Sequence, residues 1–256
     1  MGSYETTFKD IAGLKDYSVI FSAVVSHLET GASAEELVIE NDAFDMRTEK
    51  GRKKVAWAFD RLVLHFKSEQ HKSITRSIFN DEIPSADKNF FLLWQLCLND
   101  RLIREITSQI FAKIYVSGRV SISQDDIIGY VKNNIISGET SPDWSEETNY
   151  RIAVRFLNLM TKLGFVSTGR VKKFEYVRPS TEAQVIFLYF AKLFAPEHSD
   201  ILTNPFLSLS FIAKEDIQER MKKLSMKDYF RMNFNGVALK IELTHSYEEI
   251  CHVLYN

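Results

Sequence analysis

One stretch of the chain constrains the fold more than any other. Residues 143–180 read DWSEETNYRIAVRFLNLMTKLGFVSTGRVKKFEYVRPS, and Ile152, Phe156, Leu159 and Leu163 form an apolar stripe at helical spacing. Gly164 follows where a helix would end. The alternating segments FVS and VKKFEYV come next, joined by a short turn. The stretch therefore predicts an amphipathic helix that leads directly into a two-stranded hairpin.

The residues before this stretch extend the pattern. Helices are expected through 85–117 with a break near Asn99 and Asp100, RVSIS at 119–123 alternates like a short strand, and Ser123 would cap a helix that runs to Ile136. Residues 101–178 thus give the order helix, strand, helix, loop, helix, hairpin. This is the element order of a winged helix-turn-helix, in which the third helix enters the DNA major groove.

The remaining segments are also mostly helical. The spacing predicts helices at 17–29 and 48–67, with a short helix between them that Ser33 and Glu36 would cap. Past residue 180 it predicts helices at 181–195, 214–224 and 247–254, and a hairpin at 229–243 with a tight type I′ turn at Asn235 and Gly236. One interpretation of this last part is a degenerate second winged unit. The fold class is mostly α with small β-hairpin wings, divided into a helical N-terminal domain (1–100), a winged helix-turn-helix-like unit (101–180) and a C-terminal helix and hairpin unit (181–256).

Charge is unevenly distributed along the chain. The formal net charge of the 256 residues is −2, yet residues 148–178 hold seven Lys or Arg against one acid, and residues 47–76 hold nine against three. Each of these segments therefore nets +6 while the rest of the chain nets −14. A solvated helix face is the structural explanation of such clusters. Because a helix and its following hairpin are both basic, we expect instead a site for nucleic acid, where each cation placed on a phosphate releases counterions.

The predicted DNA-binding residues fall into three groups. One stripe of the helix would face the groove, the hairpin would hold phosphates, and the basic helix near residue 50 would make a second backbone contact. These groups are, in order, Thr148, Arg151, Arg155, Asn158 and Lys162; Arg170, Lys172 and Lys173; and Arg52, Lys53 and Lys54.

Motifs for catalysis are missing from the sequence. The chain has no GxxxxGK[ST], GxGxxG, HExxH or GxSxG pattern, so we expect no enzyme, no cofactor and no small-molecule substrate. His245, Glu248, Cys251 and His252 could be drawn as a metal site, but their helical positions do not converge, and no metal is expected. Cys97 and Cys251 are expected to be free buried thiols in a reducing cytoplasm. The apolar run FFLLWQLCL at 90–98 is too short to span a membrane, so a soluble cytoplasmic protein is expected.

Several segments together resemble a known family. LETGASAEELVIEND, RLVLHF, NFFLLWQL and DWSEETNYRIAVRFLNLMTKLGFV, with Trp144, Ser145, Thr148, Leu163 and Gly164 as the most specific positions, are similar to the BrxA family of bacterial BREX phage-defence systems over about residues 15–200. The resemblance implies a non-enzymatic helical protein that binds double-stranded DNA and supports methylation and restriction by larger BREX proteins. A likeness of that family to the NusB antitermination fold makes RNA the rival ligand. A protein-interaction scaffold and an enzyme of the same operon are the other interpretations left open.

Overall fold

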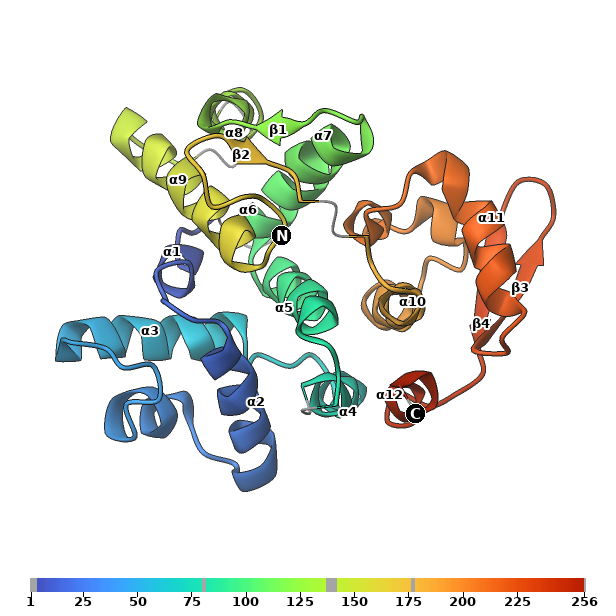
Figure 1. Cartoon of the computed structure of the whole chain (residues 1–256), viewed down its shortest axis with the longest axis horizontal. Helices are drawn as coiled ribbons and strands as arrows, with labels where there is room; N and C mark the ends of the chain where they lie inside the picture. The colour runs from blue at the N-terminus through green and yellow to red at the C-terminus, as the bar shows by residue number, and fades with distance from the viewer. Residues whose placement is uncertain (1–3, 80–81, 137–141, 176–177, 256) are drawn as a thin grey trace. The chain divides into compact units, whose positions relative to one another are not determined.

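The computed structural model describes residues 4–79, 82–136, 142–175 and 178–255. The chain forms two compact units, drawn in Figure 1: unit 1 comprises Met1–His65 and Leu92–Val177, and unit 2 comprises Phe66–Phe91 and Arg178–Asn256. Each unit is described by itself below. The architecture is mostly helical with small antiparallel strand pairs, which confirms the predicted fold class.

The helices and strands have the following bounds. In unit 1 they are α1 (Phe8–Ile11), α2 (Ser18–Thr30), η1 (Glu36–Glu40), α3 (Glu49–Leu62), α6 (Arg101–Ile106), η2 (Thr107–Phe111), α7 (Ala112–Val116), β1 (Ser121–Ile122), α8 (Gln124–Tyr130), η3 (Val131–Ile136), α9 (Glu146–Lys162) and β2 (Lys172–Lys173). In unit 2 they are α4 (Glu69–Ile78), α10 (Thr181–Phe194), η4 (Ile201–Thr203), η5 (Leu207–Ser210), α11 (Lys214–Ser225), β3 (Phe230–Phe234), β4 (Leu239–Leu243) and α12 (Ile250–Tyr255). Helix α5 (Ser85–Asn99) begins in unit 2 and ends in unit 1.

Local capping explains where several helices of unit 1 begin. The Ser33 Oγ accepts from the Glu36 N–H at 3.1 Å while the Glu36 carboxylate accepts from the Ser33 N–H at 2.6 Å. Ser123 and Asp126 form the same reciprocal arrangement at the start of α8. Each pair satisfies two backbone donors that the first helical turn leaves without partners. The predicted starts of these two helices are therefore confirmed.

Unit 1 contains a small two-stranded sheet. β1 pairs with β2 in antiparallel register, with Ser121 opposite Lys173, and a bridge joins Val166 to Phe174 on the other side of β2. The segment 165–175, which we call the basic hairpin, therefore lies beside β1, as Figure 1 shows. Helices α8 and α9 pack against each other next to this sheet. The predicted helices and strand and residues 165–175 of the predicted hairpin are present in this order, whereas residues 137–141 of the predicted loop and 176–177 of the predicted hairpin lie outside the described residues.

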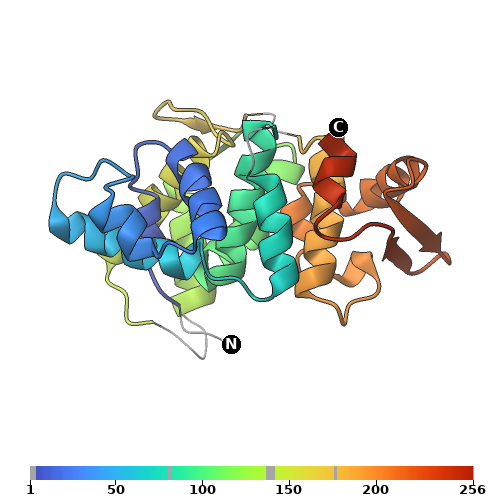
Figure 2. The same ribbon diagram turned by 90° about the horizontal axis from the view of Figure 1, so that it is seen from below.

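Unit 2 is organised around α10, an almost wholly buried helix. Residues 183–191 of α10 are all buried. The Asp87 carboxylate accepts from the Ser180 Oγ at 2.8 Å and from the Tyr255 Oη at 2.7 Å, so one buried acid joins the starts of α5 and α10 to the end of α12. β3 and β4 form a hairpin that lies at one edge of the unit in both views (Figures 1 and 2).

Two predictions about local structure differ from the structure. The helix expected over 48–67 ends at Leu62, and Ser68 caps a separate helix, α4, through a hydrogen bond from the His71 N–H. The hairpin at 229–243 exists, but Phe234 pairs with Leu239, so residues 235–238 form a four-residue loop in place of a two-residue type I′ turn. In that loop only Gly236 has a positive φ, whereas the predicted turn requires one at Asn235 too.

The predicted domain boundaries also do not coincide with the compact units. The boundary near residue 100 lies inside unit 1, and residues 66–91 belong to unit 2 together with the C-terminal part. Only the boundary near residue 180 falls close to a change of unit. The chain crosses between units within α5, a continuous helix without glycine, proline or a polar run to indicate the crossing.

Candidate nucleic-acid interface

Helix α9 carries the side chains predicted to face a groove. It begins where the Ser145 Oγ accepts from the Thr148 N–H at 3.2 Å, and the acids Glu146 and Glu147 occupy its first turn, where the helix dipole favours them. Gly164, with a φ of 78°, follows its end. The apolar stripe of α9 is buried in unit 1, so the opposite stripe is the one left to solvent or to a partner.

The basic hairpin is held firmly to the body of unit 1. Its backbone makes hydrogen bonds within the hairpin and to the residue before β1. The Ser167 N–H donates to the Lys173 carbonyl at 2.8 Å, and the Phe174 N–H donates to the Val120 carbonyl at 2.9 Å. The Phe174 ring packs edge-on against Phe111 at 5.2 Å. A second edge-on contact joins it to Tyr115 of α7 at 5.5 Å. The cations of the hairpin are therefore presented on an anchored element.

Two of the three predicted phosphate contacts on the hairpin are available to a ligand. Arg170 and Lys173 are exposed, and in the described part of the chain neither makes an ion pair. Lys172 is half-buried, and its Nζ donates to the Ser167 carbonyl at 3.2 Å. Val171 lies between these cations and is 61 % exposed. Arg170 and Lys173 are thus the better placed of the three for a polyanion.

The predicted groove-facing stripe is only partly open. Thr148 and Asn158 are half-buried, and the Thr148 hydroxyl lies 3.1 Å from the Ser145 Oγ. Arg151 is exposed but pairs with Glu147 of the preceding turn, its Nε 2.6 Å from the carboxylate. A small cavity of about 110 Å³ separates Thr148, Arg151 and Ile152 from the N-terminal segment at Thr6, Phe8 and Lys9. Helix α1 packs against α9, on the side where a duplex was expected.

Lys162 does not face a groove, contrary to the prediction. Its ammonium donates to the Ala12 carbonyl at 3.1 Å and also to the Leu14 carbonyl, and it lies 5.6 Å from the centre of the Tyr17 ring. Burial lowers the pKa of Lys162, and the neighbouring positive charge of Arg155 adds to that effect. Lys162 thus holds the turn after α1 against α9, whereas Arg155, predicted in the same stripe, is exposed.

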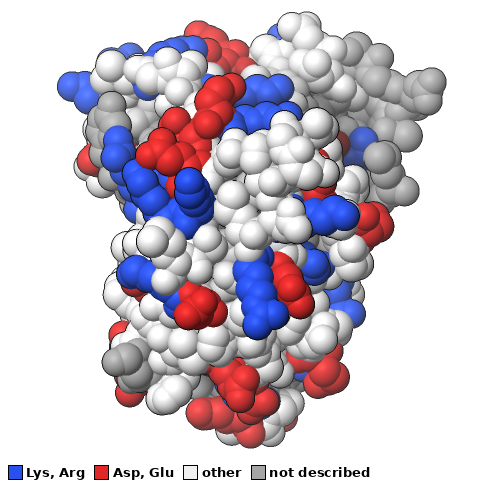
Figure 3. Space-filling view, turned by 90° about the vertical axis from the view of Figure 1, so that its right-hand side faces the viewer, with Lys and Arg blue, Asp and Glu red and all other residues white. Residues whose placement is uncertain are grey.

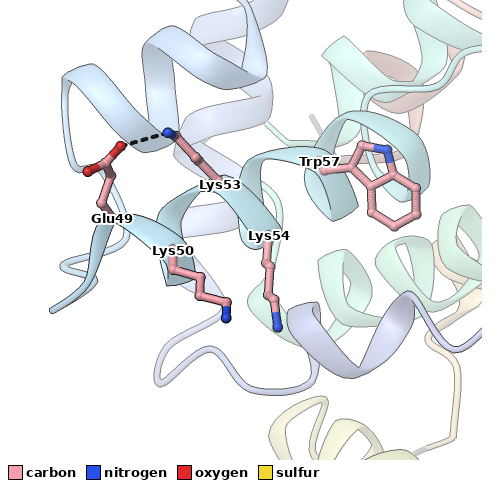
Figure 4. Close-up of a pocket in the computed structure, with 5 residues that line it drawn as sticks. All are labelled: Glu49, Lys50, Lys53, Lys54 and Trp57. Carbon is pink, nitrogen blue, oxygen red and sulfur yellow. Dashed lines mark ion pairs between the residues drawn. The ribbon is translucent and has the colours of Figure 1, made fainter.

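Two of the three cations predicted on α3 are also engaged within the chain. The Arg52 Nε donates to the Met46 carbonyl at 3.1 Å and lies 3.2 Å from the Asp42 carboxylate. Lys53 pairs with Glu49 at 2.7 Å, as Figure 4 shows. Lys54 is exposed and has no ion-pair partner among the described residues. Of the predicted second contact with a DNA backbone, only Lys54 is left without an ion pair in the described residues. Lys50, one turn earlier on α3, is equally exposed, and the prediction left it out.

An exposed tryptophan beside these lysines was also missed. Trp57 is 51 % exposed, and with Lys50 and Lys54 it lines a shallow hollow of about 530 Å³ on the outer face of α3. A signal was present in the sequence: Trp57 follows Lys50 and Lys54 at seven and three residues, which places all three on one helix face, away from Val55 and Phe59.

The C-terminal hairpin of unit 2 lacks a comparable basic cluster. Arg231 is paired across the strands with Glu242, and Lys240 with Asn233. In the view of Figure 3, Lys and Arg side chains are interspersed with Asp and Glu. This surface is typical of a solvated or partner-contacting face more than of a phosphate site.

Asp126, Cys97 and Cys251 are engaged or buried within the chain. Asp126 caps α8 and is bound by both terminal nitrogens of Arg119, at 2.8 and 2.6 Å. Cys97 and Cys251 are free and buried, as predicted, and burial raises the pKa of each thiol to about 12. Across the described ranges, no three His, Cys, Asp or Glu side chains come together as a metal site.

Comparison with known proteins identifies the family of the chain. No helix in the described parts of the chain is both long enough and apolar enough to cross a membrane. A search of curated proteins gave no match. The family model of BrxA matches residues 3–187, which is more than half of the chain and includes α9 and the basic hairpin. The chain therefore belongs to the BrxA family, whose members are associated with BREX systems.

Proposed function

We propose that the protein is a non-enzymatic double-stranded DNA-binding component of a bacterial BREX phage-defence system, acting in the cytoplasm with other proteins of that system. The observation that carries the proposal is the pair of exposed cations Arg170 and Lys173 on the anchored basic hairpin. Membership of the BrxA family agrees with a BREX association.

The arrangement of unit 1 supports a winged helix-turn-helix as the DNA-binding element. α8 and α9 would be its two central helices, and β1 with the basic hairpin would form its wing. In that fold the wing lies on phosphates or in the minor groove beside the bound helix. Arg170 and Lys173 would then contact the backbone, because their charges are exposed and free of ion pairs within the described chain.

Sequence specificity would be low. Phosphate contacts position a protein on DNA but carry no sequence information. Only Arg151, Arg155 and Asn158 of α9 remain for base edges, and Arg151 would first have to leave Glu147. Since α1 packs along α9 and Lys162 holds the turn that follows α1, shallow binding led by the hairpin is favoured over deep insertion of α9.

RNA is the weaker candidate for the same surface. The major groove of double-stranded RNA is deep and narrow, so a helix with a wing matches B-DNA better. A protein-interaction scaffold is the second candidate function. It is favoured by Val120 and Val171, which directly precede β1 and β2, are 71 % and 61 % exposed and would suit a partner protein.

The test is a fluorescence-anisotropy titration of a labelled duplex of about 30 base pairs, a length chosen to cover three helical turns. Arg170→Glu with Lys173→Glu should weaken binding about 10-fold or more, since two phosphate contacts become repulsive. Lys222→Glu with Lys227→Glu, an equal charge change on exposed residues of unit 2, is the matched control. Circular dichroism would confirm that both variants are folded. Equal binding by wild type and the hairpin variant would contradict the proposal and favour the scaffold.

A further inference from the structure

The outer face of α3 combines two free lysines with an exposed indole. Lys50 and Lys54 are exposed, and no ion pair holds either of them within the described chain. They lie one turn apart, about 6 Å along the helix axis, and Trp57 follows in the next turn. Figure 4 shows both lysines directed to the same side of the helix, away from the Glu49–Lys53 pair.

Trp57 is fixed in place without being covered. The Arg61 guanidinium lies 5.2 Å from the centre of its ring and is itself held by Glu5, at 2.5 Å. A cation over the ring and an ion pair behind that cation limit the rotation of the indole, while 51 % of Trp57 stays exposed. The ring is therefore an ordered flat surface that a second planar group could stack on.

The charge around Trp57 indicates which ligand this surface suits. Trp57 and Lys53 line two hollows. The hollow that Glu49, Lys50 and Lys54 complete is basic, with three lysines against one acid, whereas the hollow that contains Glu35, Ile39 and Asp60 has one lysine against two acids. An anionic ligand would occupy the basic side. Lysine is depleted at the centre of protein interfaces, so two lysines beside the indole favour nucleic acid over a protein partner.

We propose that Lys50, Lys54 and Trp57 form a binding site for single-stranded nucleic acid, in which an unpaired base stacks on Trp57 and the two ammonium groups hold adjacent phosphates. Bases in a duplex are already stacked on each other, so only an unpaired base is free to stack on the indole. Aromatic stacking combined with backbone cations is the usual means of binding single strands without sequence preference. This inference rests on the proposed function only in treating the chain as a nucleic-acid-binding protein, since it uses none of the hairpin residues.

The probe is an oligothymidylate of about 15 nucleotides, a length within the site size of one single-strand-binding domain. Binding should quench tryptophan emission, because stacking places a base on the indole. The quenching should disappear in Trp57→Phe and persist in Trp144→Phe, where the replaced side chain is half-buried against Tyr4. Trp94 is 1 % exposed and contributes a constant background.

Affinity provides the second measurement. Trp57→Ala should weaken oligothymidylate binding about 10-fold, as expected for the loss of one base–aromatic stack. Lys50→Glu with Lys54→Glu should weaken it further, and the control pair Lys222→Glu with Lys227→Glu should leave it unchanged. Unchanged affinity in Trp57→Ala, or quenching that survives in Trp57→Phe, would overturn the inference.

The same titrations separate this inference from the proposed function. Arg170→Glu with Lys173→Glu should reduce duplex binding while oligothymidylate still quenches Trp57. If wild type binds oligothymidylate through Trp57 but binds no duplex, the inference stands and the proposed function fails. If wild type binds duplex and oligothymidylate causes no quenching, the inference alone fails.

Discussion

Lys162 and Lys173 carry the same charge in opposite surroundings. Lys162 is half-buried, and its ammonium donates hydrogen bonds to the carbonyls of Ala12 and Leu14. These two bonds take the place of hydrogen bonds to water. Lys173 is exposed and has no ion pair within the described chain. A buried lysine engaged in this way stabilises the fold, whereas an exposed and unpaired one can give its charge to a ligand.

Replacing each lysine by Met should separate these roles. Lys162→Met should lower the free energy of unfolding by about 1–3 kcal/mol, because two buried carbonyl groups lose a charged donor. Its duplex affinity should stay close to that of wild type. Lys173→Met should show the reverse pattern, with unchanged stability and weaker binding. Urea unfolding and duplex titration of both variants would check this, and a weaker effect on stability than on binding for Lys162→Met would contradict it.

Asp100 makes the stability of unit 1 depend on pH. It caps α6 through a hydrogen bond from the Ile103 N–H at 2.9 Å. Burial raises the pKa of this carboxyl from 3.8 to about 7, although backbone donors from Ile103 and Leu102 oppose the rise. The folded state therefore holds a proton that the unfolded chain releases. The stabilisation that comes from this proton is complete below about pH 4 and is lost as the pH rises through about 7.

Asp100→Asn should remove that dependence, since an amide oxygen can still cap the helix without a charge. The variant should gain stability relative to wild type as the pH increases from 4.5 to 8. Urea unfolding at several pH values measures the difference, with Asp125→Asn, a change at an exposed position of α8, as the baseline. A difference that is constant over this range, or that shrinks at high pH, would contradict the assignment.

Among the elements, the basic hairpin depends on one aromatic anchor. Phe174 packs against Phe111 and Tyr115, and its N–H completes the pairing to Val120. Phe174→Ala keeps every cation but removes the ring, and should cost about 2–4 kcal/mol of stability. We expect hydrogen exchange of residues 165–175 to accelerate and duplex affinity to fall. Full affinity with an unprotected hairpin would show that the position of the hairpin does not matter for binding.

The sequence predicted best those elements whose cause is local. Ser33 with Glu36, and Ser123 with Asp126, cap helices where these were predicted, because each cap involves residues three apart. Apolar spacing likewise identified the buried face of α9.

Features that depend on distant contacts could not be predicted in the same way. The role of Lys162 requires the turn at residues 12–14 to lie beside α9, and that contact joins positions about 150 residues apart. The passage of α5 from unit 2 to unit 1 likewise depends on contacts between residues far apart in the sequence. The position of Trp57 is different in kind, because helix spacing alone places it on the face of α3 opposite Val55 and Phe59.

For the whole molecule, the basic segment at 47–76 is divided between the two units. Lys67, Lys72 and Arg76 lie in unit 2, while the cations from Arg47 to Arg61 lie in unit 1. Ion pairs of Arg52, Lys53 and Arg61 reduce the free charge further. Exposed cations of unit 1 that make no ion pair within the described residues include Arg170 and Lys173 on the basic hairpin and Lys50 and Lys54 on the outer face of α3. An overall charge of −2 is therefore compatible with polyanion binding at these two places.

The most direct test of the central claim is the salt dependence of duplex binding. The association constant of the wild-type protein for the duplex should fall steeply as the salt concentration rises. The slope of its logarithm against the logarithm of the salt concentration has a magnitude of about 0.9 for each neutralised phosphate. Arg170→Glu with Lys173→Glu should lower that slope by about 2, because two contacts are lost. The control Lys222→Glu with Lys227→Glu should keep the wild-type slope. A slope near zero for wild type, or an unchanged slope in the hairpin variant, would contradict DNA binding through the basic hairpin.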